Sequence, residues 1–463
     1  MDLIAKLAEI LGPDHVLTGA DAARFGREWT GHYRWTPLAV VRPAHTAEVA
    51  AVLRLAHLTG TKVVPVAGNT GLNGGTYAEG ALMLSLARLN KVREINVQAR
   101  TVVAEAGVVL ETLHDLAGGH GLAFPLTFGS KGSAMVGGFL STNAGGSNVV
   151  RYGSARALCL GLEVVLADGR IWHGLTGLHK DNTGYDLRDL VIGAEGTLGI
   201  ITAAVLRLTP APTAYATALV GLETLADALA LLNAIQAATG GAVEAFEFMP
   251  ERYMDRLASA RPGLACPFPP APVNLLVEIA STTPTDTGAA IDPVSRLEAL
   301  LGAALAAGRI QDAVIAQSTA QRSKLWEMRE SAAEITFTTP DIVDCDIALP
   351  LDRLETFLVR MTPRLAALDP EAEELVIGHL GDGNLHYTAY PSRSDPALGA
   401  AIRAAVTEEA VALGGSFSAE HGVGISKRAT MAAHKDPVAL EMMAAIKTAL
   451  DPKGILNPGK VLP

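Results

Sequence analysis

A glycine-rich loop that directly follows an apolar strand constrains this chain more than any other feature. Residues 68–75 read Gly-Asn-Thr-Gly-Leu-Asn-Gly-Gly and come after the strand predicted at residues 62–66. Glycines let the backbone approach a ligand closely and point successive N–H groups at it, which is how a chain cradles a diphosphate. An ordinary flexible turn is the alternative, and the concentration of glycine, asparagine and threonine argues against it. The loop fits neither G-x-G-x-x-G nor G-x-x-x-x-G-K-[ST], so neither a Rossmann dinucleotide site nor a P-loop is supported.

Two further glycine-rich segments follow in the same half of the chain. One runs through residues 125–153 and contains the pairs Gly137-Gly138 and Gly145-Gly146, and the other covers residues 193–202. Each segment alone is weak evidence. Three in one domain predict a large cofactor that the chain contacts along its whole length.

Length and composition favour a two-domain globular protein. A chain of 463 residues with 49% hydrophobic content is long enough for two cores. Its formal charge of −11 argues against nucleic acid or an anionic membrane as the main partner. Three dispersed cysteines favour neither a disulfide framework nor a thiolate zinc site. Because the first residues lack a signal-peptide pattern and no apolar stretch could span a bilayer, we expect a cytoplasmic protein.

The two halves differ in their predicted elements. The first alternates strands (residues 38–41, 62–66 and 199–208) with helices, among them residues 46–59 with Thr46 as N-cap. Asp168-Gly169 predicts a hairpin between residues 160–166 and 170–173. Pro210 and Pro212 mark a boundary. Beyond it, strands at residues 273–279, 342–349 and 375–379 and helices at residues 222–238 and 351–368 suit an antiparallel sheet with helices on one face; residues 261–272 and 281–293 are expected to be loops.

His379 and His386 flank Gly381-Asp382-Gly383-Asn384. If Asp382-Gly383 forms a two-residue type I′ turn, the histidines face each other with Cβ atoms roughly 5 Å apart, as a metal pair requires. Glu420 could supply a third ligand, and the adjacent His421 would point another way and meet the substrate as a base. A polar hairpin and a satisfied histidine are the alternative, which would be preferred for either His379 or His421 alone.

The glycine-rich loops resemble those of FAD-linked oxidoreductases with the vanillyl-alcohol oxidase and p-cresol methylhydroxylase (PCMH) fold, over nearly the whole chain. Residues 180–187 (Lys-Asp-Asn-Thr-Gly-Tyr-Asp-Leu), 379–386 and 420–424 resemble the D-2-hydroxyglutarate and D-lactate dehydrogenase branch. The resemblance implies an α+β fold. A two-subdomain FAD-binding domain of the PCMH type would cover residues 1–212. A substrate (cap) domain with an antiparallel sheet, flanking helices and the metal hairpin would cover residues 213–415, and residues 416–463 would return to the first domain.

The resemblance also implies roles for individual residues. His379, His386 and Glu420 match metal ligands, His421 matches the catalytic base, and Arg329 matches the arginine that binds the substrate carboxylate; a solvated helix face is the alternative for Arg329. Asn384 and Thr388 are predicted to contact substrate. The residues predicted to hold FAD are Val66, Gly68, Asn69, Thr70, Gly71, Leu72, Pro125, Leu126, Thr127, Gly129, Gly132, Ser133, Gly138, Thr142, Asn143, Gly145, Gly146, Gly196, Ile201 and Asn457, with Lys460 also reaching back from the tail.

The implied reaction oxidises a D-2-hydroxy acid to its 2-oxo acid. Ligation by nitrogen and carboxylate suits zinc best, although manganese or cobalt would fit. The metal would act as a Lewis acid on the substrate oxygens, His421 would remove the hydroxyl proton, and a hydride would pass to flavin N5. The diphosphate loop offers neither histidine nor cysteine, so we expect dissociable FAD. The acceptor could be electron-transfer flavoprotein, a quinone, a cytochrome or oxygen, and a homodimer is common in this group.

D-2-hydroxyglutarate is the leading substrate by this resemblance. The chain departs from the hydroxyglutarate pattern at Ala333, where a hydroxyl residue is expected, at Asp344, where a lysine is expected, and at Thr388, often an asparagine. D-lactate or another D-2-hydroxy acid is therefore the alternative. Rival functions are a zinc hydrolase, a catalytically silent flavin-binding module, and a nicotinamide dehydrogenase, which the missing fingerprint disfavours.

Overall fold

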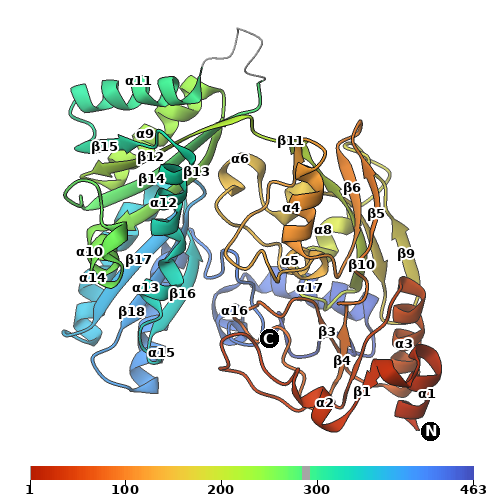
Figure 1. The fold of residues 1–463 in the computed structure, drawn as a ribbon. Coiled ribbons are helices and arrows are strands. Elements are labelled where there is room, and N and C mark those ends of the chain that lie inside the picture. The colour runs from red at the N-terminus through yellow and green to blue at the C-terminus, as the bar shows by residue number, and fades with distance from the viewer. Residues whose placement is uncertain (1, 284–291) are drawn as a thin grey trace. The chain divides into compact units, whose positions relative to one another are not determined.

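The computed structural model describes residues 2–283 and 292–463, which divide into two compact units (Figure 1). Unit 1 comprises Met1–Gly145, Gly153–Pro210 and Glu420–Pro463, and unit 2 comprises Gly146–Tyr152 and Ala211–Ala419. Of the loop expected at residues 281–293, residues 284–291 lie outside the described residues. No helix in the described part of the chain is both long and apolar enough to cross a membrane.

Unit 1 contains two main sheets. The first has the order β1 (Val16–Leu17), β2 (Ala39–Val41), β4 (Leu82–Ser85) and β3 (Val63–Val66), with β4 parallel to both β2 and β3. Helices α1 (Leu3–Leu11) and α3 (Thr46–Thr59) pack on it through an apolar core that includes Leu7, Leu53 and Leu84. The N-cap of α3 is His45 rather than Thr46, because the Thr46 hydroxyl donates to Glu163 at 2.6 Å instead.

The second sheet of unit 1 is antiparallel. Its order is β5 (Val92–Asn96), β6 (Thr101–Glu105), β10 (Ile200–Arg207), β8 (Cys159–Val165) and β9 (Ile171–Gly174). The hairpin predicted at Asp168-Gly169 is confirmed, since Val165 pairs with Ile171 and Gly169 adopts φ +83°. The remaining elements of unit 1 are α2 (Gly19–Ala23), α4 (Leu110–Gly118), α5 (Val136–Ser141), α7 (Ala155–Leu158), α8 (Leu187–Val191), α16 (Arg428–His434), α17 (Pro437–Leu450) and the pair β7 (Leu122–Ala123) with β11 (Thr209–Pro210).

The C-terminal tail of unit 1 pairs with the edge of its first sheet. Val63 N–H donates to Ile455 O at 2.8 Å, and Asn457 N–H donates to Val63 O at 2.8 Å. These bonds bring Asn457 to strand β3, from which the first glycine-rich loop leaves. The turn-rich tail is therefore an ordered part of this sheet's edge.

Unit 2 is built on one seven-stranded sheet, which is antiparallel, as predicted. Its order is β15 (Asp312–Ile315), β12 (Ala214–Leu222), β14 (Val273–Ser281), β13 (Val243–Pro250), β17 (Glu373–His379), β18 (Asn384–Tyr390) and β16 (Val343–Ala348). Residues that alternate along these strands fill two separate apolar cores, one on each face. The sheet is therefore buried on both sides over much of its area.

Helices cover both faces of this sheet, so the prediction that they lie on one face is wrong. One core contains side chains of α9 (Leu225–Thr239), α11 (Pro293–Ala306), α14 (Leu354–Leu368) and α15 (Pro396–Ala412). The other contains side chains of α10 (Glu251–Ala260), α12 (Thr319–Glu330) and α13 (Ala332–Thr336). A short helix, α6 (Val149–Tyr152), also belongs to unit 2 and is tied to β13 by Arg151 and Tyr152, which donate to Glu244 at 2.8 and 2.5 Å.

Candidate functional site

The loop that follows β3 has no space for a side chain at its first glycine, Gly68. A Cβ on Gly68 would lie 2.2 Å from Ser133 O, whereas a Cβ on Gly71 would meet no atom within 4 Å. Asn69 and Gly74 adopt positive φ of 54° and 67°, which bends the loop back on itself. One side of the loop is thus packed tightly, and Gly71 leaves its backbone approachable.

All three glycine-rich segments meet around the end of β3. The second reaches the first at the close contact of Gly68 with Ser133, and a Cβ on Gly138 would touch Ala67 at 3.4 Å. The third reaches β3 itself, because a Cβ on Gly196 would lie 2.5 Å from Pro65 Cγ. The structure therefore brings together the segments that the sequence analysis assigned to one cofactor. Their glycines let the backbone come close to a bound group at this point.

The tail adds a buried acceptor beside this cradle. The Asn457 side-chain N–H₂ donates to Gly75 O at 3.1 Å and to Glu195 O at 2.6 Å. Its Oδ1 is buried and has no hydrogen-bond partner among the described residues. Lys460 donates to Tyr77 O at 2.5 Å, and burial lowers the pKa of its ammonium group to about 8. An orphaned acceptor at the cradle fits a donor on a bound ligand.

The other residues predicted to hold FAD lie on several elements. Asn143 has φ +51°, and its side-chain oxygen accepts from Ser154 and from Arg156 N–H, both at 2.9 Å, so this oxygen is used within the protein. The division between units falls between Gly145 and Gly146, which places Gly146 in unit 2. The rest occupy unit 1: Val66 ends β3, Pro125, Leu126 and Thr127 follow β7, Thr142 caps α5, and Ile201 lies in β10.

The histidine hairpin of unit 2 has a different register from the one predicted. Residues 380–383 form the loop, His379 pairs with Asn384, and His386 pairs with Ile377. The two-residue turn is therefore wrong, although the same-face conclusion survives because diagonal neighbours two positions apart also share a face. The imidazole centroids lie 5.4 Å apart at 82°. This register depends on Gly383, whose φ is +84° and whose Cβ would lie 2.2 Å from Leu349 O.

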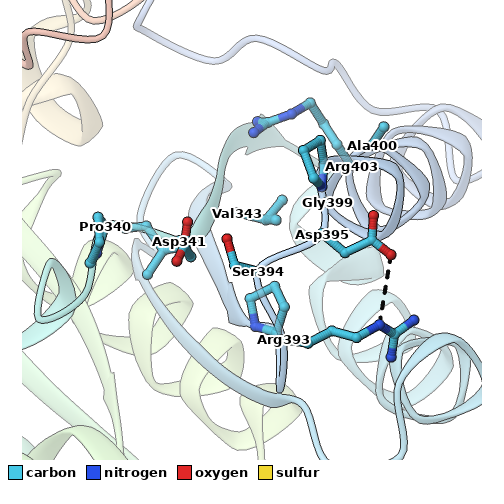
Figure 2. A pocket seen from close by; sticks show the side chains of 12 residues that line it. Pro340, Asp341, Val343, Arg393, Ser394, Asp395, Gly399, Ala400 and Arg403 are labelled. Carbon is cyan, nitrogen blue, oxygen red and sulfur yellow. Dashed lines mark ion pairs between the residues drawn. The ribbon is translucent and has the colours of Figure 1, made fainter.

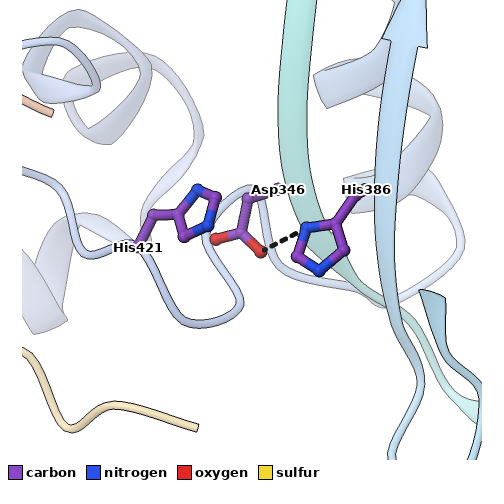
Figure 3. Close-up of side chains that lie close together, drawn as sticks. All are labelled: Asp346, His386 and His421. Carbon is purple, nitrogen blue, oxygen red and sulfur yellow. Dashed lines mark ion pairs between the residues drawn. The ribbon is translucent and has the colours of Figure 1, made fainter. Parts of the chain in front are cut away.

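Each histidine faces a buried carboxylate that was not predicted from the sequence. Glu247 lies opposite His379 on β13, with its Oε2 2.8 Å from His379 Nδ1. Asp346 lies opposite His386 on β16, with its Oδ1 3.9 Å from His386 Nδ1 (Figure 3). A carboxylate hydrogen-bonded to Nδ1 orients a metal-binding imidazole and directs Nε2 away from it, as Glu247 does for His379; Asp346 lies at ion-pair distance from His386. The donor set in unit 2 therefore fits a divalent metal.

Arg329 is buried beside the same carboxylate, not on a solvated helix face. It is 9% exposed, and its Nε lies 3.0 Å from Glu247 Oε2. Burial raises the pKa of Glu247, but the charges and hydrogen bonds of His379 and Arg329 outweigh it and hold that pKa below its usual value. One anionic carboxylate thus positions both a candidate metal ligand and the candidate carboxylate-binding arginine. An acidic residue between Phe246 and Phe248 in an apolar strand was the signal that could have revealed Glu247.

The remaining predicted substrate residues lie farther along β18. The Asn384 side chain donates to Asp346 Oδ1 and to Ile347 O, each at 3.0 Å, so it braces the carboxylate behind His386. Thr388 is buried and donates to Asp344 Oδ1 at 3.0 Å. Because Asp344 pairs with Thr388 and Asp346 pairs with His386, these four side chains share one face of the sheet. With Glu247 opposite His379, that face carries three carboxylates near the histidines.

Glu420 and His421 open the last segment of unit 1. Within this unit, Asn73 Nδ2 donates to His421 O at 3.0 Å and to Gly422 O at 2.7 Å. The loop from 421 to 424 is thus attached to the first glycine-rich segment.

A hollow of about 370 Å³ lies elsewhere in unit 2, at the start of β16 (Figure 2). Its lining includes Asp341, Arg403 and the ion pair of Arg393 with Asp395 at 3.6 Å. Arg403 also donates to Asp344 O at 2.7 Å. The lining differs from the predicted site residues, so this hollow is separate from the histidine face.

Two family models match the chain. The model described as "FAD linked oxidases, C-terminal domain" matches residues 211–461, and the model described as "FAD binding domain" matches residues 37–174. Together they cover the glycine-rich segments up to residue 174 and all of the histidine hairpin.

Curated relatives carry one recurring name. The chain is 39% identical over 438 residues to the mitochondrial D-2-hydroxyglutarate dehydrogenase of Bos taurus, covering 94% of this chain and 79% of the relative. It is 36% identical over 450 residues to the D-2-hydroxyglutarate dehydrogenase of Xanthomonas citri pv. viticola, covering 96% and 93%.

Solved structures share the fold at low identity. Substrate-bound p-cresol methylhydroxylase superposes with a TM-score of 0.75 at 16% identity, covering 99% of this chain and 96% of that one. Alkyldihydroxyacetonephosphate synthase gives a TM-score of 0.71 at 16% identity, covering 99% and 84%. The fold inferred from the glycine-rich loops is confirmed.

Proposed function

The chain belongs to the family of FAD-linked oxidases that includes the D-2-hydroxyglutarate dehydrogenases, and from this premise we propose that it oxidises a D-2-hydroxy acid to the 2-oxo acid with the help of a divalent metal. It is a FAD-dependent oxidoreductase. The observation that carries the finer proposal is the pair His379 and His386, each backed by a buried carboxylate. Bound FAD supplies the two-electron acceptor for the hydrogen on the substrate's 2-carbon.

We propose Glu420 as the third metal ligand. Ala419 N–H donates to Asp346 Oδ2 at 3.1 Å, and Asp346 lies opposite His386. A peptide-bonded neighbour follows at a Cα distance of ~3.8 Å. Glu420 is the residue peptide-bonded to Ala419, and this connectivity supports the proposal. Two imidazoles and one carboxylate suit zinc, and also manganese or cobalt; a bound divalent ion supplies Lewis-acid chemistry at the substrate oxygens.

The protein's own groups have three tasks in this proposal. Arg329 binds the substrate carboxylate through the guanidinium edge that Glu247 leaves available, while Glu247 holds the arginine in place. His421 takes the proton from the 2-hydroxyl group. The glycine cradle binds FAD. Electrons then pass to an acceptor such as electron-transfer flavoprotein or a quinone; a homodimer in the cytoplasm is also part of the proposal.

FAD is expected to be held without a covalent bond. The segments gathered around β3 at residues 65–75 and 193–199 contain neither histidine nor cysteine. Acid precipitation should therefore leave a colourless pellet and a yellow supernatant. Yellow colour that stays in the washed pellet would contradict this expectation.

Two substrates are supported by different observations. The relatives favour D-2-hydroxyglutarate. Asp344, held by Thr388 on the histidine face, favours D-lactate or another D-2-hydroxy acid without a distal carboxylate, because two carboxylates brought together repel each other. The kcat/KM ratio for D-2-hydroxyglutarate over D-lactate, measured with a redox dye, decides between them.

Asp344→Asn tests the origin of this preference. Removing the negative charge is expected to raise kcat/KM for D-2-hydroxyglutarate by roughly tenfold, equivalent to about 1.4 kcal/mol, and to leave kcat/KM for D-lactate within about twofold. Asp341→Asn, at an exposed carboxylate before β16, is the matched control and should change neither value. An equal change for both substrates would remove Asp344 from substrate selection.

Two rival functions predict other outcomes. A zinc hydrolase built on His379, His386 and Glu420 predicts a colourless purified protein. A silent flavin-binding module predicts a yellow protein whose flavin no D-2-hydroxy acid reduces. An anaerobic screen of D- and L-2-hydroxy acids on metal-replete protein separates both from the proposed dehydrogenase.

A further inference from the structure

The loop after His421 forms an anion-binding nest that the proposed reaction does not use. Gly422 and Gly424 have φ of +75° and +52°, and residues on either side of a left-handed turn direct successive N–H groups to one point. Val423 N–H donates to Glu195 Oε1 at 2.6 Å, and Gly424 N–H donates to Glu195 Oε2 at 2.9 Å. The nest is thus filled by a carboxylate of the third glycine-rich segment.

The fit around this carboxylate explains both glycines. A Cβ on Gly422 would lie 2.7 Å from Glu195 Oε1, and a Cβ on Gly424 would lie 2.0 Å from Asn73 O. A side chain at either position would strain the backbone, and it would displace the Glu195 carboxylate at Gly422 or the Asn73 backbone at Gly424. In the pattern His-Gly-Val-Gly, the two glycines therefore permit a backbone that both Glu195 and Asn73 hold by hydrogen bonds.

Asn73 holds the opposite side of the same loop. Besides its bonds to His421 O and Gly422 O, its own carbonyl accepts from Ile425 N–H at 2.8 Å. The Ser426 hydroxyl donates to Asn73 Oδ1 at 3.0 Å. The peptide groups on both sides of the Gly422 α-carbon are therefore fixed by hydrogen bonds.

The backbone of Glu195 is itself held by hydrogen bonds to two other parts of unit 1. Its N–H donates to Ser141 O at 2.9 Å, and its carbonyl accepts from Asn457 at 2.6 Å. Its φ is +51°, an uncommon conformation for a residue with a side chain. Burial raises the pKa of Glu195, and the N–H donors of Val423 and Gly424 oppose that rise. Glu195 therefore links the third glycine-rich segment, to which it belongs, to the tail and to the His421 loop.

We infer that Glu195 is a positioning residue, which sets the direction of the His421 imidazole by holding the backbone of residues 422–424. The inference rests on the proposed role of His421 as base. A base acts only from within hydrogen-bond reach of the proton, and displacement of a catalytic group by about 1 Å can cost about 100-fold in rate. Glu195 makes no proton transfer of its own in this account.

Glu195→Gln tests the inference with little change in shape. A glutamine can accept one of the two N–H groups, while its own N–H₂ opposes the other. We expect FAD content to be unchanged, flavin reduction at saturating D-2-hydroxy acid to slow about 10- to 100-fold, and the substrate concentration at half-saturation to stay within about threefold. Glu195→Asp keeps the charge but draws it back by one methylene, so its rate should be intermediate; it also answers the question if the glutamine variant does not fold.

The matched control is Glu163→Gln, at another buried carboxylate of unit 1, which pairs with Arg93 at 3.0 Å on the antiparallel sheet. It should lose thermal stability and keep the reduction rate. If Glu195→Gln behaves like this control, losing thermal stability but keeping the reduction rate, Glu195 is merely structural and the inference is overturned.

A double variant shows whether Glu195 acts through His421. In a His421→Asn background, Glu195→Gln should slow the residual reduction by no more than about twofold, because residues that act as one unit are non-additive. The same 10- to 100-fold loss in both backgrounds would overturn the inference. If His421→Asn alone reduced its flavin at the unmodified rate, the proposed function of His421 would fail first, and that result appears without any change at Glu195.

Discussion

Replacement of His421 by asparagine is expected to leave FAD bound and to slow reduction of the flavin by substrate about 100- to 10,000-fold. Asparagine keeps a polar group close to the backbone. It also leaves the backbone carbonyl of residue 421, to which Asn73 donates, unchanged. It cannot accept the hydroxyl proton, and general-base catalysis contributes a factor of this size. Anaerobic stopped-flow absorbance of the oxidised flavin band measures the rate directly.

The control for this variant is His434→Asn, at the last residue of α16 in the same C-terminal segment. It should reduce its flavin at the unmodified rate. Reduction of His421→Asn within about twofold of the unmodified protein would exclude His421 as the base and would leave the metal proposal standing.

Replacement of His386 by alanine is expected to abolish metal binding and to slow flavin reduction at least about 100-fold. The histidine is one of three proposed ligands, and its loss also leaves Asp346 without the imidazole that faces it 3.9 Å away. Loss of a Lewis acid that stabilises developing charge costs several kcal/mol in the transition state. Metal content is measured by elemental analysis, and the rate by anaerobic flavin reduction.

Chelation provides the matching experiment on the unmodified chain. Removal of metal should stop flavin reduction while FAD stays bound, and zinc, manganese or cobalt should restore it. His120→Ala, at an exposed histidine of unit 1, is the control and should keep both metal and rate. Full activity of the metal-free protein would contradict a metal-assisted reaction.

Local sequence predicted the elements of the fold better than their packing. The Asp168-Gly169 hairpin follows from local turn chemistry and is confirmed. The position of helices on both faces of the unit 2 sheet was missed because it depends on which strands become neighbours. A distant partner also changes the start of α3. The Thr46 hydroxyl donates to Glu163, 117 residues away, and His45 is the N-cap.

The histidine hairpin shows how tertiary contact decides register. Asp382-Gly383 is a strong local signal for a two-residue turn, yet the loop spans residues 380–383 because Gly383 packs against Leu349 O. The prediction of two histidines on one face survived because a slip of two positions preserves the face. A slip of one would have separated them.

The residues that support the candidate site were the hardest to predict. Each of these residues is acidic, and its partner lies far away in the sequence. Glu247 contacts His379, 132 positions away, and Asp346 faces His386, 40 positions away. Glu195 accepts from Val423, 228 positions away. The spacing of residues in the sequence does not predict such pairs. The glycines were easier, since close backbone approach leaves no other residue type at positions such as Gly68.

The most direct test of the proposed reaction is an anaerobic titration of the metal-replete, FAD-loaded protein with the D and L forms of 2-hydroxyglutarate and lactate. At least one D acid should bleach the flavin band fully and yield one 2-oxo acid per flavin, while its L form leaves the band unchanged. If no D-2-hydroxy acid reduces the flavin, or if both forms do so equally, the assignment as a D-2-hydroxyacid dehydrogenase is wrong.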